Sequence, residues 1–504
     1  MRNLSSSFRM VILACPDSLF NKSVDTFRVY VSELMRRLIT DPRYRRGSDG
    51  KYHHYQLPCS RLQEYIIVYV PRDVAGEVTV RLMRKVSLCY SELINDGRFR
   101  SACNEVAPYI FRAVVHRSVK CLDFVRNKEH PTMLDYHKEV NGDLVYRTLP
   151  LLRDLKVLRI GKMATFASVS LDVEGFRDSL EKFSTLNYLE KDIEELANKC
   201  KRIRCLDLGG TITYPSNICN LISRFEYLEE LNLSLLRFLS GDDLEVILYW
   251  LFGFLPFYTL PSQKPGSTAT LSEASSRTHK EALMEDLFQN RPLRHSGQLK
   301  SFGCANATDE HIDLISMFYN LKSLVLCDVT PSCSLAALRC LNRLTNLTLI
   351  RSRFSDVEEF LKVSGNQLIC LNLVDVFGTN LNLISQKCRS LECLHLCFSR
   401  PEHLILPANY LDVGSHSLPF PDFPLVVTLQ LYITEQPARG YILSLFPNLR
   451  KLVLLYTGDD LTLLDSIMNR TRLVRLEEFY WGLQTVMVFS DRAPWFRSSV
   501  WVHE

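Results

Sequence analysis

The sequence lacks an apolar segment long enough to cross a lipid bilayer. Its most apolar uncharged run, residues 246–260, has 15 residues and contains Pro256, whereas a transmembrane helix needs about 20. The start is also unlike a secretory signal, because the apolar stretch 10–15 has six residues and a signal core has about 7–15. We therefore expect neither a membrane span nor export.

Motifs of the common catalytic and cofactor sites are missing as well. The sequence has no Gly-x-x-x-x-Gly-Lys-Ser/Thr phosphate loop, no Gly-x-Gly-x-x-Gly after a strand and no Gly-x-Ser-x-Gly nucleophile elbow. Paired Cys-x-x-Cys motifs for zinc are absent, and the histidine doublet His53-His54 has no partners at ligand spacing. We expect no catalytic residue, no cofactor and no metal.

Neither the charge nor the cysteines suggest a specialised environment. The formal net charge is +4, too balanced for a dedicated nucleic-acid-binding protein. Many of the 16 cysteines, such as Cys205, Cys370, Cys393 and Cys397, fall in strand-like segments rather than at a disulfide-framework spacing. Free thiols indicate a reducing compartment, so we expect a cytoplasmic or nuclear protein.

What the sequence does contain is a repeat. The pattern apolar-x-x-apolar-x-x-Leu-x-Leu recurs along most of the chain. The first residue of each Leu-x-Leu pair falls at 158, 206, 231, 302, 324, 347, 371, 394, 429, 452 and 479. From 302 to 394 the steps are 22, 23, 24 and 23, within the range of about 20–29 of leucine-rich repeats.

The longer steps indicate irregularities in the array. The step of 48 from 158 to 206 predicts a degenerate repeat between 161 and 200, and the step of 35 from 394 to 429 predicts an insertion. The step of 71 from 231 to 302 is close to three periods, but residues 259–280 are rich in Pro, Ser, Thr and Gly. Such a composition predicts a disordered loop.

The physical basis of the pattern is a short strand whose side chains alternate between two faces. The leucines point inward, and because one repeat cannot bury its own leucines, neighbouring repeats must stack. Helical patterns on the outer side fall at 308–317, 354–361 and 459–468, and the second carries Ser355 and Glu358 at the spacing of a capping box. The fold class we predict is an α/β leucine-rich-repeat solenoid, a curved parallel sheet inside and helices outside, with an all-helical N-terminal region.

Two copies carry a further resemblance. The segments NKCKRIRCLDLGG and SQKCRSLECLHLCFS resemble the cysteine-containing class of leucine-rich repeats, in which a polar segment ending in Cys precedes the strand. This class is typical of F-box proteins, which are substrate receptors of cullin–RING ubiquitin ligases. The resemblance implies a protein-binding role.

The N-terminal region contains a second resemblance. After an amphipathic helix predicted at 25–38, the stretch 57–73 resembles the opening of an F-box, in which Leu-Pro precedes a helix that ends near Leu-Pro-x-x-Asp. The Cys-Lys-x-Trp stretch that follows in the family is missing. Residues implied in adaptor docking are Leu57, Pro58, Leu62, Ile66, Val70 and Pro71. Three alternatives stay open here: an F-box, a different cullin-adaptor module, and a helical cap that seals the first repeat.

The domain organisation follows from these segments. We predict a helical region at 1–148, a first part of the solenoid at 149–258, a disordered insertion at 259–296, a second part of the solenoid at 297–484, and a C-terminal cap or tail at 485–504.

The binding surface is expected on the concave face, at positions inside and beside Leu-x-Leu. The residues predicted there are Arg159, Asp207, Glu230, Asn232, Asn372, Val374, His395, Tyr432, Lys451, Leu455, Glu478 and Tyr480. Aromatic residues dominate protein interfaces, so the two tyrosines are the leading candidates.

The sequence thus predicts a non-enzymatic receptor that holds a client protein on its concave face. The resemblance adds a Skp1-type or other cullin adaptor at residues 50–120, as in the substrate-recognition subunit of an SCF-type ligase. The alternative is an RNI-like leucine-rich-repeat scaffold or regulator without a ubiquitin role. We expect neither nucleic acid nor membrane as a partner.

Overall fold

The central feature of the computed structural model is one sheet whose strands follow one another in chain order. The structure describes residues 17–41, 55–124, 141–160, 171–185, 190–208, 224–234, 297–331, 333–398, 403–405, 422–433, 445–454, 478–481 and 485–488, together with a few single residues between them. In these ranges β1 to β13 pair in parallel, and β14 pairs antiparallel with β13.

The strands are short, as stacking of single turns requires. They are β1 (Cys121–Asp123), β2 (Val157–Ile160), β3 (Lys182–Thr185), β4 (Cys205–Asp207), β5 (Glu230–Asn232), β6 (Ser301–Ala305), β7 (Ser323–Cys327), β8 (Asn346–Ile350), β9 (Cys370–Val374), β10 (Cys393–Phe398), β11 (Thr428–Ile433), β12 (Lys451–Leu454), β13 (Glu478–Trp481) and β14 (Thr485–Val488).

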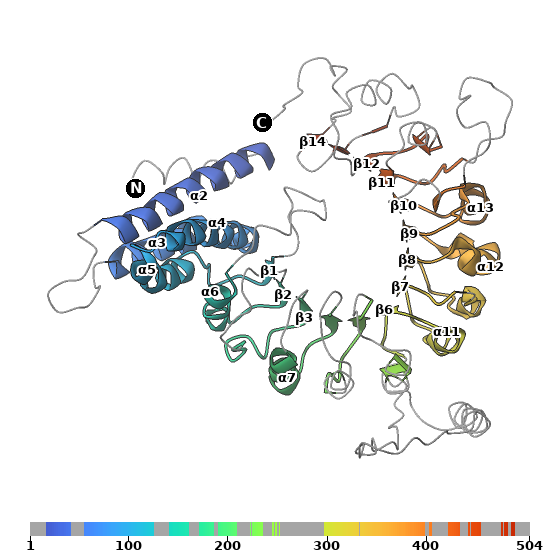
Figure 1. Cartoon of the computed structure of the whole chain (residues 1–504), viewed down its shortest axis with the longest axis horizontal. Coiled ribbons are helices and arrows are strands. Elements are labelled where there is room, and N and C mark those ends of the chain that lie inside the picture. Colours follow the sequence, from blue (N-terminus) through green and yellow to red (C-terminus); the bar gives the residue numbers. More distant parts are fainter. Residues whose placement is uncertain are drawn as a thin grey trace.

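The sheet lines the inside of an arc, and the helices of the repeats lie outside it (Figure 1). The outer elements are α7 (Glu190–Lys199), α11 (Asp309–Ser316), α12 (Phe354–Ser364) and α13 (Leu381–Lys387), with short 3-10 turns η3 (Leu149–Leu151), η5 (Leu335–Cys340) and η6 (Gly365–Gln367). This arrangement confirms the predicted fold class, an α/β leucine-rich-repeat solenoid.

The register of the sheet confirms the repeat found in the sequence. From Leu206 to Leu452, each first residue of a Leu-x-Leu pair is the Cα partner of the next one, as for Leu347, Leu371 and Leu394. These side chains are buried and form one continuous core with the apolar residues that precede them. Burial of a leucine side chain contributes about 1.5–3 kcal/mol, so the stacked leucines supply most of the stability of the array.

A backbone contact repeats beside the leucines. The carbonyl of the residue before each strand accepts two N–H groups from the next repeat. Lys322 O, for example, accepts from Thr345 N at 2.9 Å and from Asn346 N at 2.9 Å. The same pattern joins the repeats from Lys120 to Lys451. Because only main-chain atoms take part, the register is independent of the side chain at this position.

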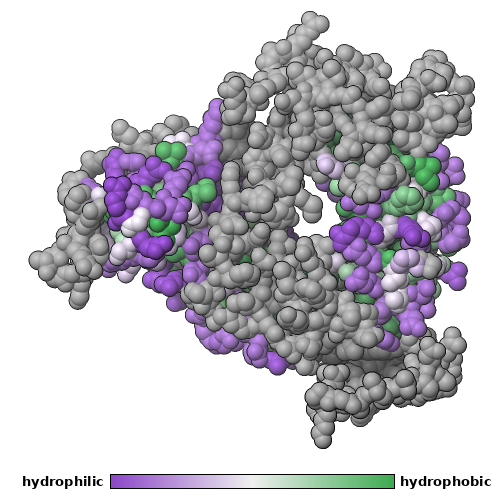
Figure 2. All heavy atoms as spheres, in the orientation of Figure 1, coloured by the Kyte–Doolittle hydropathy of each residue, from purple (hydrophilic) through white to green (hydrophobic). Residues whose placement is uncertain are grey.

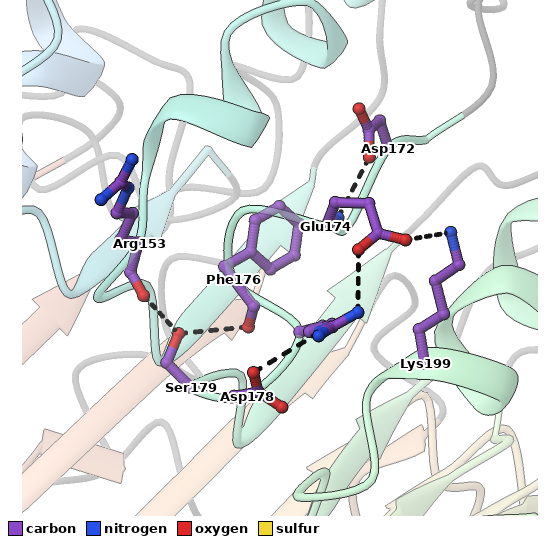
Figure 3. A network of polar contacts seen from close by, with 8 residues as sticks. Arg153, Asp172, Glu174, Phe176, Asp178, Ser179 and Lys199 are labelled. Atoms are coloured by element: carbon purple, nitrogen blue, oxygen red, sulfur yellow. Dashed lines mark hydrogen bonds and ion pairs between the residues drawn. The ribbon is translucent and has the colours of Figure 1, made fainter.

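The predicted degenerate repeat is present as β3. Leu158 on β2 pairs with Phe183, which in turn pairs with Leu206 on β4. Its preceding turn is held by Ser179, whose Oγ lies 2.8 Å from Leu155 O and 3.1 Å from Phe176 O, as Figure 3 shows in part. Glu174 beside it accepts from Lys199 Nζ at 2.6 Å. In the repeat of β3, polar contacts therefore help to hold the turn that apolar side chains hold in the other repeats.

Both predicted insertions leave the sheet unbroken. Strand β5 pairs directly with β6, and β10 pairs directly with β11, so the step of 71 adds no strand between β5 and β6. The predicted disorder at 259–296 lies outside the described residues, as does the helix expected at 459–468.

The N-terminal helices cover the first strand. They are α2 (Asp17–Thr40), α3 (Gln56–Tyr69), α4 (Ala75–Asn95), α5 (Arg100–Ala113) and α6 (Gly142–Tyr146). Helix α4 contacts β1, and it comes so close that a Cβ on Gly76 would lie 2.2 Å from Cys121 O. The helix predicted at 25–38 is part of α2, with Phe27, Val31 and Leu38 buried.

Two details differ from the sequence-based expectation. The sheet begins at β1, inside the region 1–148 that was expected to be all-helical.

The predicted capping box of Ser355 and Glu358 is wrong, because α12 begins at Phe354 and the Asp356 carboxylate accepts from Arg353 N at 3.3 Å. A parallel bridge between Arg353 and Phe377 of the next repeat fixes this earlier start.

Among the described residues, none of the helices combines the length and the apolar character that crossing a membrane requires.

Charged residues before the strands form a ladder of alternating sign. Lys156 pairs with Glu181 at 2.6 Å, whereas Glu229 receives both Arg204 at 3.1 Å and Lys300 at 2.7 Å. Hydrogen bonding to Lys300 is the main cause that lowers the pKa of Glu229 below its ordinary 4.5.

We expect Glu229→Gln to lower the free energy of unfolding at pH 7 by less than about 1 kcal/mol, because the pairs are exposed. A lowered folded-state pKa stabilises the protein above the unfolded value of 4.5, and this contribution is lost as the pH falls through the folded value. The difference between variant and wild type should therefore vanish in acid. Thermal unfolding at pH 7 and pH 3 measures it. Glu226→Gln, at an exposed position outside the ladder, is the control, and an equal loss there would contradict the prediction.

Candidate binding surface on the concave face of the sheet

The predicted binding residues lie on the inner face of the sheet where the structure describes them. Residues inside and beside each Leu-x-Leu pair alternate with the buried leucines, and Figure 2 shows hydrophilic and hydrophobic side chains mixed along the described wall of the central opening. Arg159 is exposed, and a second group is half-buried: Asp207, Glu230, Asn232, Asn372, Val374, His395, Tyr432 and Lys451. Glu478 and Tyr480 belong to β13, and Leu455 lies outside the described residues.

On the first five strands the polar side chains bind one another. Asp207 joins two neighbours, accepting from Ser184 Oγ at 2.9 Å and from Asn232 Nδ2 at 2.9 Å. Lys182 on β3 reaches across β4 to Glu230 on β5, with an Nζ–Oε1 distance of 3.2 Å. We call Ser184, Asp207 and Asn232 the polar chain.

The polar chain ends against a glycine. Gly303 on β6 is the register partner of Asn232, and a Cβ at this position would lie 2.3 Å from Asn232 Oδ1. Asn232 Oδ1 also accepts from Ser234 N at 3.0 Å. The missing side chain at Gly303 therefore leaves the space that Asn232 occupies.

The next strands present a different surface. Ile350, Val374, Cys397 and Tyr432 are register partners on β8 to β11, and each is half-buried. We call these four residues the apolar row. At a strand spacing of about 4.8 Å, the apolar row extends over roughly 14 Å.

Polar residues beside the apolar row pair locally. Asn372 Nδ2 donates to Thr348 Oγ1 at 2.9 Å, and His395 Nε2 lies 3.2 Å from Cys393 Sγ. No formally charged residue lies on the concave positions of β8 to β10, where the sequence places Asn, Thr, Ile, Cys, Val and His. This part of the surface is therefore suited to apolar contact.

Each of the strands β6 to β9 is followed directly by a residue in the left-handed conformation. Asn306, Asp328, Arg351 and Asp375 have φ angles of 56°, 49°, 50° and 51°. Asn and Asp tolerate this conformation better than other non-glycine residues. Arg351 is held by a bidentate ion pair in which its Nε lies 2.7 Å from Asp328 Oδ1.

Several residues of this surface were not predicted from the sequence, among them Ile350 and Cys397 of the apolar row and three residues of the first strands. Asp123, which accepts from Arg159 Nη1 at 3.1 Å, lies on the strand that was not predicted. Lys182 and Ser184 lie on the degenerate strand. The spacing of Val119, Leu122 and Phe124 matches the repeat and was the available signal for β1.

The residues proposed for adaptor docking differ in how far their side chains are exposed. Leu62, Ile66 and Val70 are buried in the helical layer, whereas Leu57 is 58% exposed. Pro58 and Pro71 are half-buried. The outer side of α3 also carries Val68, which is 64% exposed.

Within the described ranges, no three His, Cys, Asp or Glu side chains are grouped so that they could hold a metal ion.

The fold and this surface define the class of the molecule, a leucine-rich-repeat solenoid with a helical N-terminal region. No protein-family model matches the chain, and no curated protein does so either. Among solved structures, it is similar to an internalin from Listeria monocytogenes, with 13% identity, a TM-score of 0.27, and coverage of 68% of this chain and 84% of the internalin. It is also similar to a leucine-rich-repeat protein from Leptospira interrogans, with 14% identity, a TM-score of 0.26, and coverage of 74% and 80%.

We expect Gly303→Ala to disrupt the polar chain, because the new Cβ would displace the Asn232 amide from Asp207. Overpacking of this kind costs about 1–3 kcal/mol. Chemical denaturation measures the loss. Gly97→Ala, where a Cβ would meet nothing within 4 Å, is the control, and equal stabilities of the two variants would contradict the assignment.

Proposed function

We propose that this chain is a protein-binding scaffold that holds a client protein against the concave face. The observation that carries the proposal is the apolar row, a line of half-buried apolar side chains on four neighbouring strands of a rigid sheet. Interfaces gain most of their affinity from a few anchor residues, among which tyrosine is enriched. Tyr432, at the end of the row, is the leading anchor.

The contrast between the two parts of the concave face supports this choice. On β2 to β5 the charged and amide groups are bound to one another, so a partner would have to break those contacts. Breaking a pair leaves a polar group unsatisfied, which costs about 1–3 kcal/mol when the group becomes buried. Among the described residues the apolar row makes no such polar contacts, and covering it removes apolar area from water.

We expect Tyr432→Ala to weaken client binding by on the order of 30-fold, the effect of losing about 2 kcal/mol at an anchor. Proximity labelling with the full chain identifies the client, and calorimetry with the purified client then measures affinity. The matched control is Tyr319→Ala, which removes a 56% exposed tyrosine that lies outside the strands. Equal affinities for wild type and Tyr432→Ala would contradict this placement of the client.

A finer proposal concerns the ubiquitin system. The resemblance of 57–73 to an F-box opening supports docking of a cullin adaptor on the outer side of α3, which would make the chain the substrate receptor of an SCF-type ligase. The exposed residues available for this contact are Leu57, Ile67 and Val68. The alternative is an RNI-like scaffold in which the N-terminal helices only cap β1.

We expect Leu57→Glu with Val68→Glu to abolish adaptor binding by the full chain, because two charges would be buried in the contact. The full chain is required, since α4 packs on β1 and residues 1–150 would be cut from the sheet. Co-purification with a cullin adaptor measures binding. Val29→Glu, at a 65% exposed position on α2, is the control. If the wild type fails to bind under conditions in which a known F-box protein binds, the ubiquitin role is rejected and the scaffold role stands.

A further inference from the structure

Two thiols lie side by side on the concave face. Cys370 on β9 and Cys393 on β10 are Cα register partners in adjacent parallel strands, and both are half-buried. Adjacent strands are about 4.8 Å apart, which lies within the Cα separation of about 4.4–6.8 Å that a disulfide spans. The backbone therefore needs little movement for the two sulfurs to be joined.

The two thiols are coupled to each other. Their hydrogen bond lowers the pKa of Cys370 against the opposing effect of burial, and the same contact, followed by burial, raises the pKa of Cys393. Because one contact moves the two pKa values in opposite directions, it couples the thiols without deciding which of them reacts first.

A base stands next to the second thiol. His395 Nε2 lies 3.2 Å from Cys393 Sγ, two residues along the same strand. The Cys370 thiol donates a hydrogen bond to Asn372 Oδ1 at 3.5 Å, so an amide oxygen borders the first thiol. The cluster of two thiols, one imidazole and one amide occupies four concave positions of β9 and β10.

The other half-buried cysteines of the described residues lack these features. Burial raises the pKa of Cys205 to about 12 and that of Cys397 to about 11. The register partners of Cys205 are Lys182 and Glu230, and those of Cys397 are Val374 and Tyr432. Neither thiol therefore has a second cysteine beside it.

We propose that Cys370 and Cys393 form a redox-active dithiol that a hydroperoxide oxidises to a disulfide, with His395 as the base for Cys393. This assignment is independent of the client-binding role, because it concerns only the chemistry of the cluster.

The reaction has two steps. In the first, one thiol of the pair loses its proton and attacks one oxygen of the hydroperoxide as the thiolate. An S–O bond forms, the O–O bond breaks, and the leaving alkoxide or hydroxide takes a proton from water, so that sulfur is oxidised to sulfenic acid and the peroxide is reduced to an alcohol or water. In the second, the other thiol loses its proton and attacks the sulfur of the sulfenic acid. The S–S bond forms, the S–O bond breaks, and the departing hydroxide takes up that proton and leaves as water. His395 accepts the proton of Cys393 in the step in which this thiol ionises.

The test uses the full-length reduced protein and hydrogen peroxide, followed by peptide mass spectrometry without reductant. We expect a peptide pair linked through Cys370 and Cys393, with loss of two hydrogens. The link should be absent from Cys370→Ser and from Cys393→Ser, and present in the matched control Cys397→Ser, which removes a thiol from the same strand and face. Absence of the link from the oxidised wild type would overturn the proposal.

Two further measurements test the cluster. In Cys393→Ser and Cys370→Ser, a 1,3-dicarbonyl reagent should trap sulfenic acid on the cysteine of the pair that remains in at least one of the two variants. Trapping on other cysteines but on neither member of the pair would overturn the proposal. His395→Asn should slow disulfide formation by on the order of tenfold or more, as loss of a general base does. An unchanged rate would overturn the role of His395.

Discussion

The structure depends on one backbone carbonyl per repeat. The residue before each strand accepts two N–H groups from the repeat that follows, as Ile369 O does from Glu392 N at 2.9 Å and Cys393 N at 3.0 Å. Nearly every buried backbone donor needs such a partner, so this contact fixes where the next strand must begin. Once that start is fixed, the alternation of side chains places every Leu-x-Leu pair in the core and every intervening residue on the concave face.

The regular spacing of the leucines in the sequence was enough to predict this arrangement. The leucines at 324, 347 and 371 are separated by nearly constant intervals and become register partners. A fixed apolar period of this kind is the sequence signature of stacked repeats, because each repeat buries its leucines at the same position. Concave residues such as Asn372 and Tyr432 could be named for the same reason. Which of them pair with one another could not be predicted, since that depends on the lateral neighbours which the register brings together.

Where prediction failed, tertiary contacts replaced the local pattern. In the repeat that contains β3, Arg177 stands where Leu152 and Cys200 stand in the adjacent copies, and Phe176 fills the buried place instead. Thr185 replaces the second leucine and is buried nonetheless. The start of α12 was misplaced because a bridge to the next repeat, rather than the nearest Ser-x-x-Glu, decides where the helix begins. Local propensity is a weak prior when such contacts compete with it.

The same carbonyl contact explains why long insertions leave the concave face intact. Glu229 O accepts from Lys300 N at 2.7 Å and from Ser301 N at 3.2 Å, although the two sides are 71 residues apart. Loop-closure entropy grows only with the logarithm of loop length, so a longer connection weakens the contact little. The strands on either side consequently keep their register. Residues such as Asn232 and Gly303, or Cys397 and Tyr432, therefore meet as closely across an insertion as neighbours do without one, and the concave surface is set by the stacking rather than by the length of the loops.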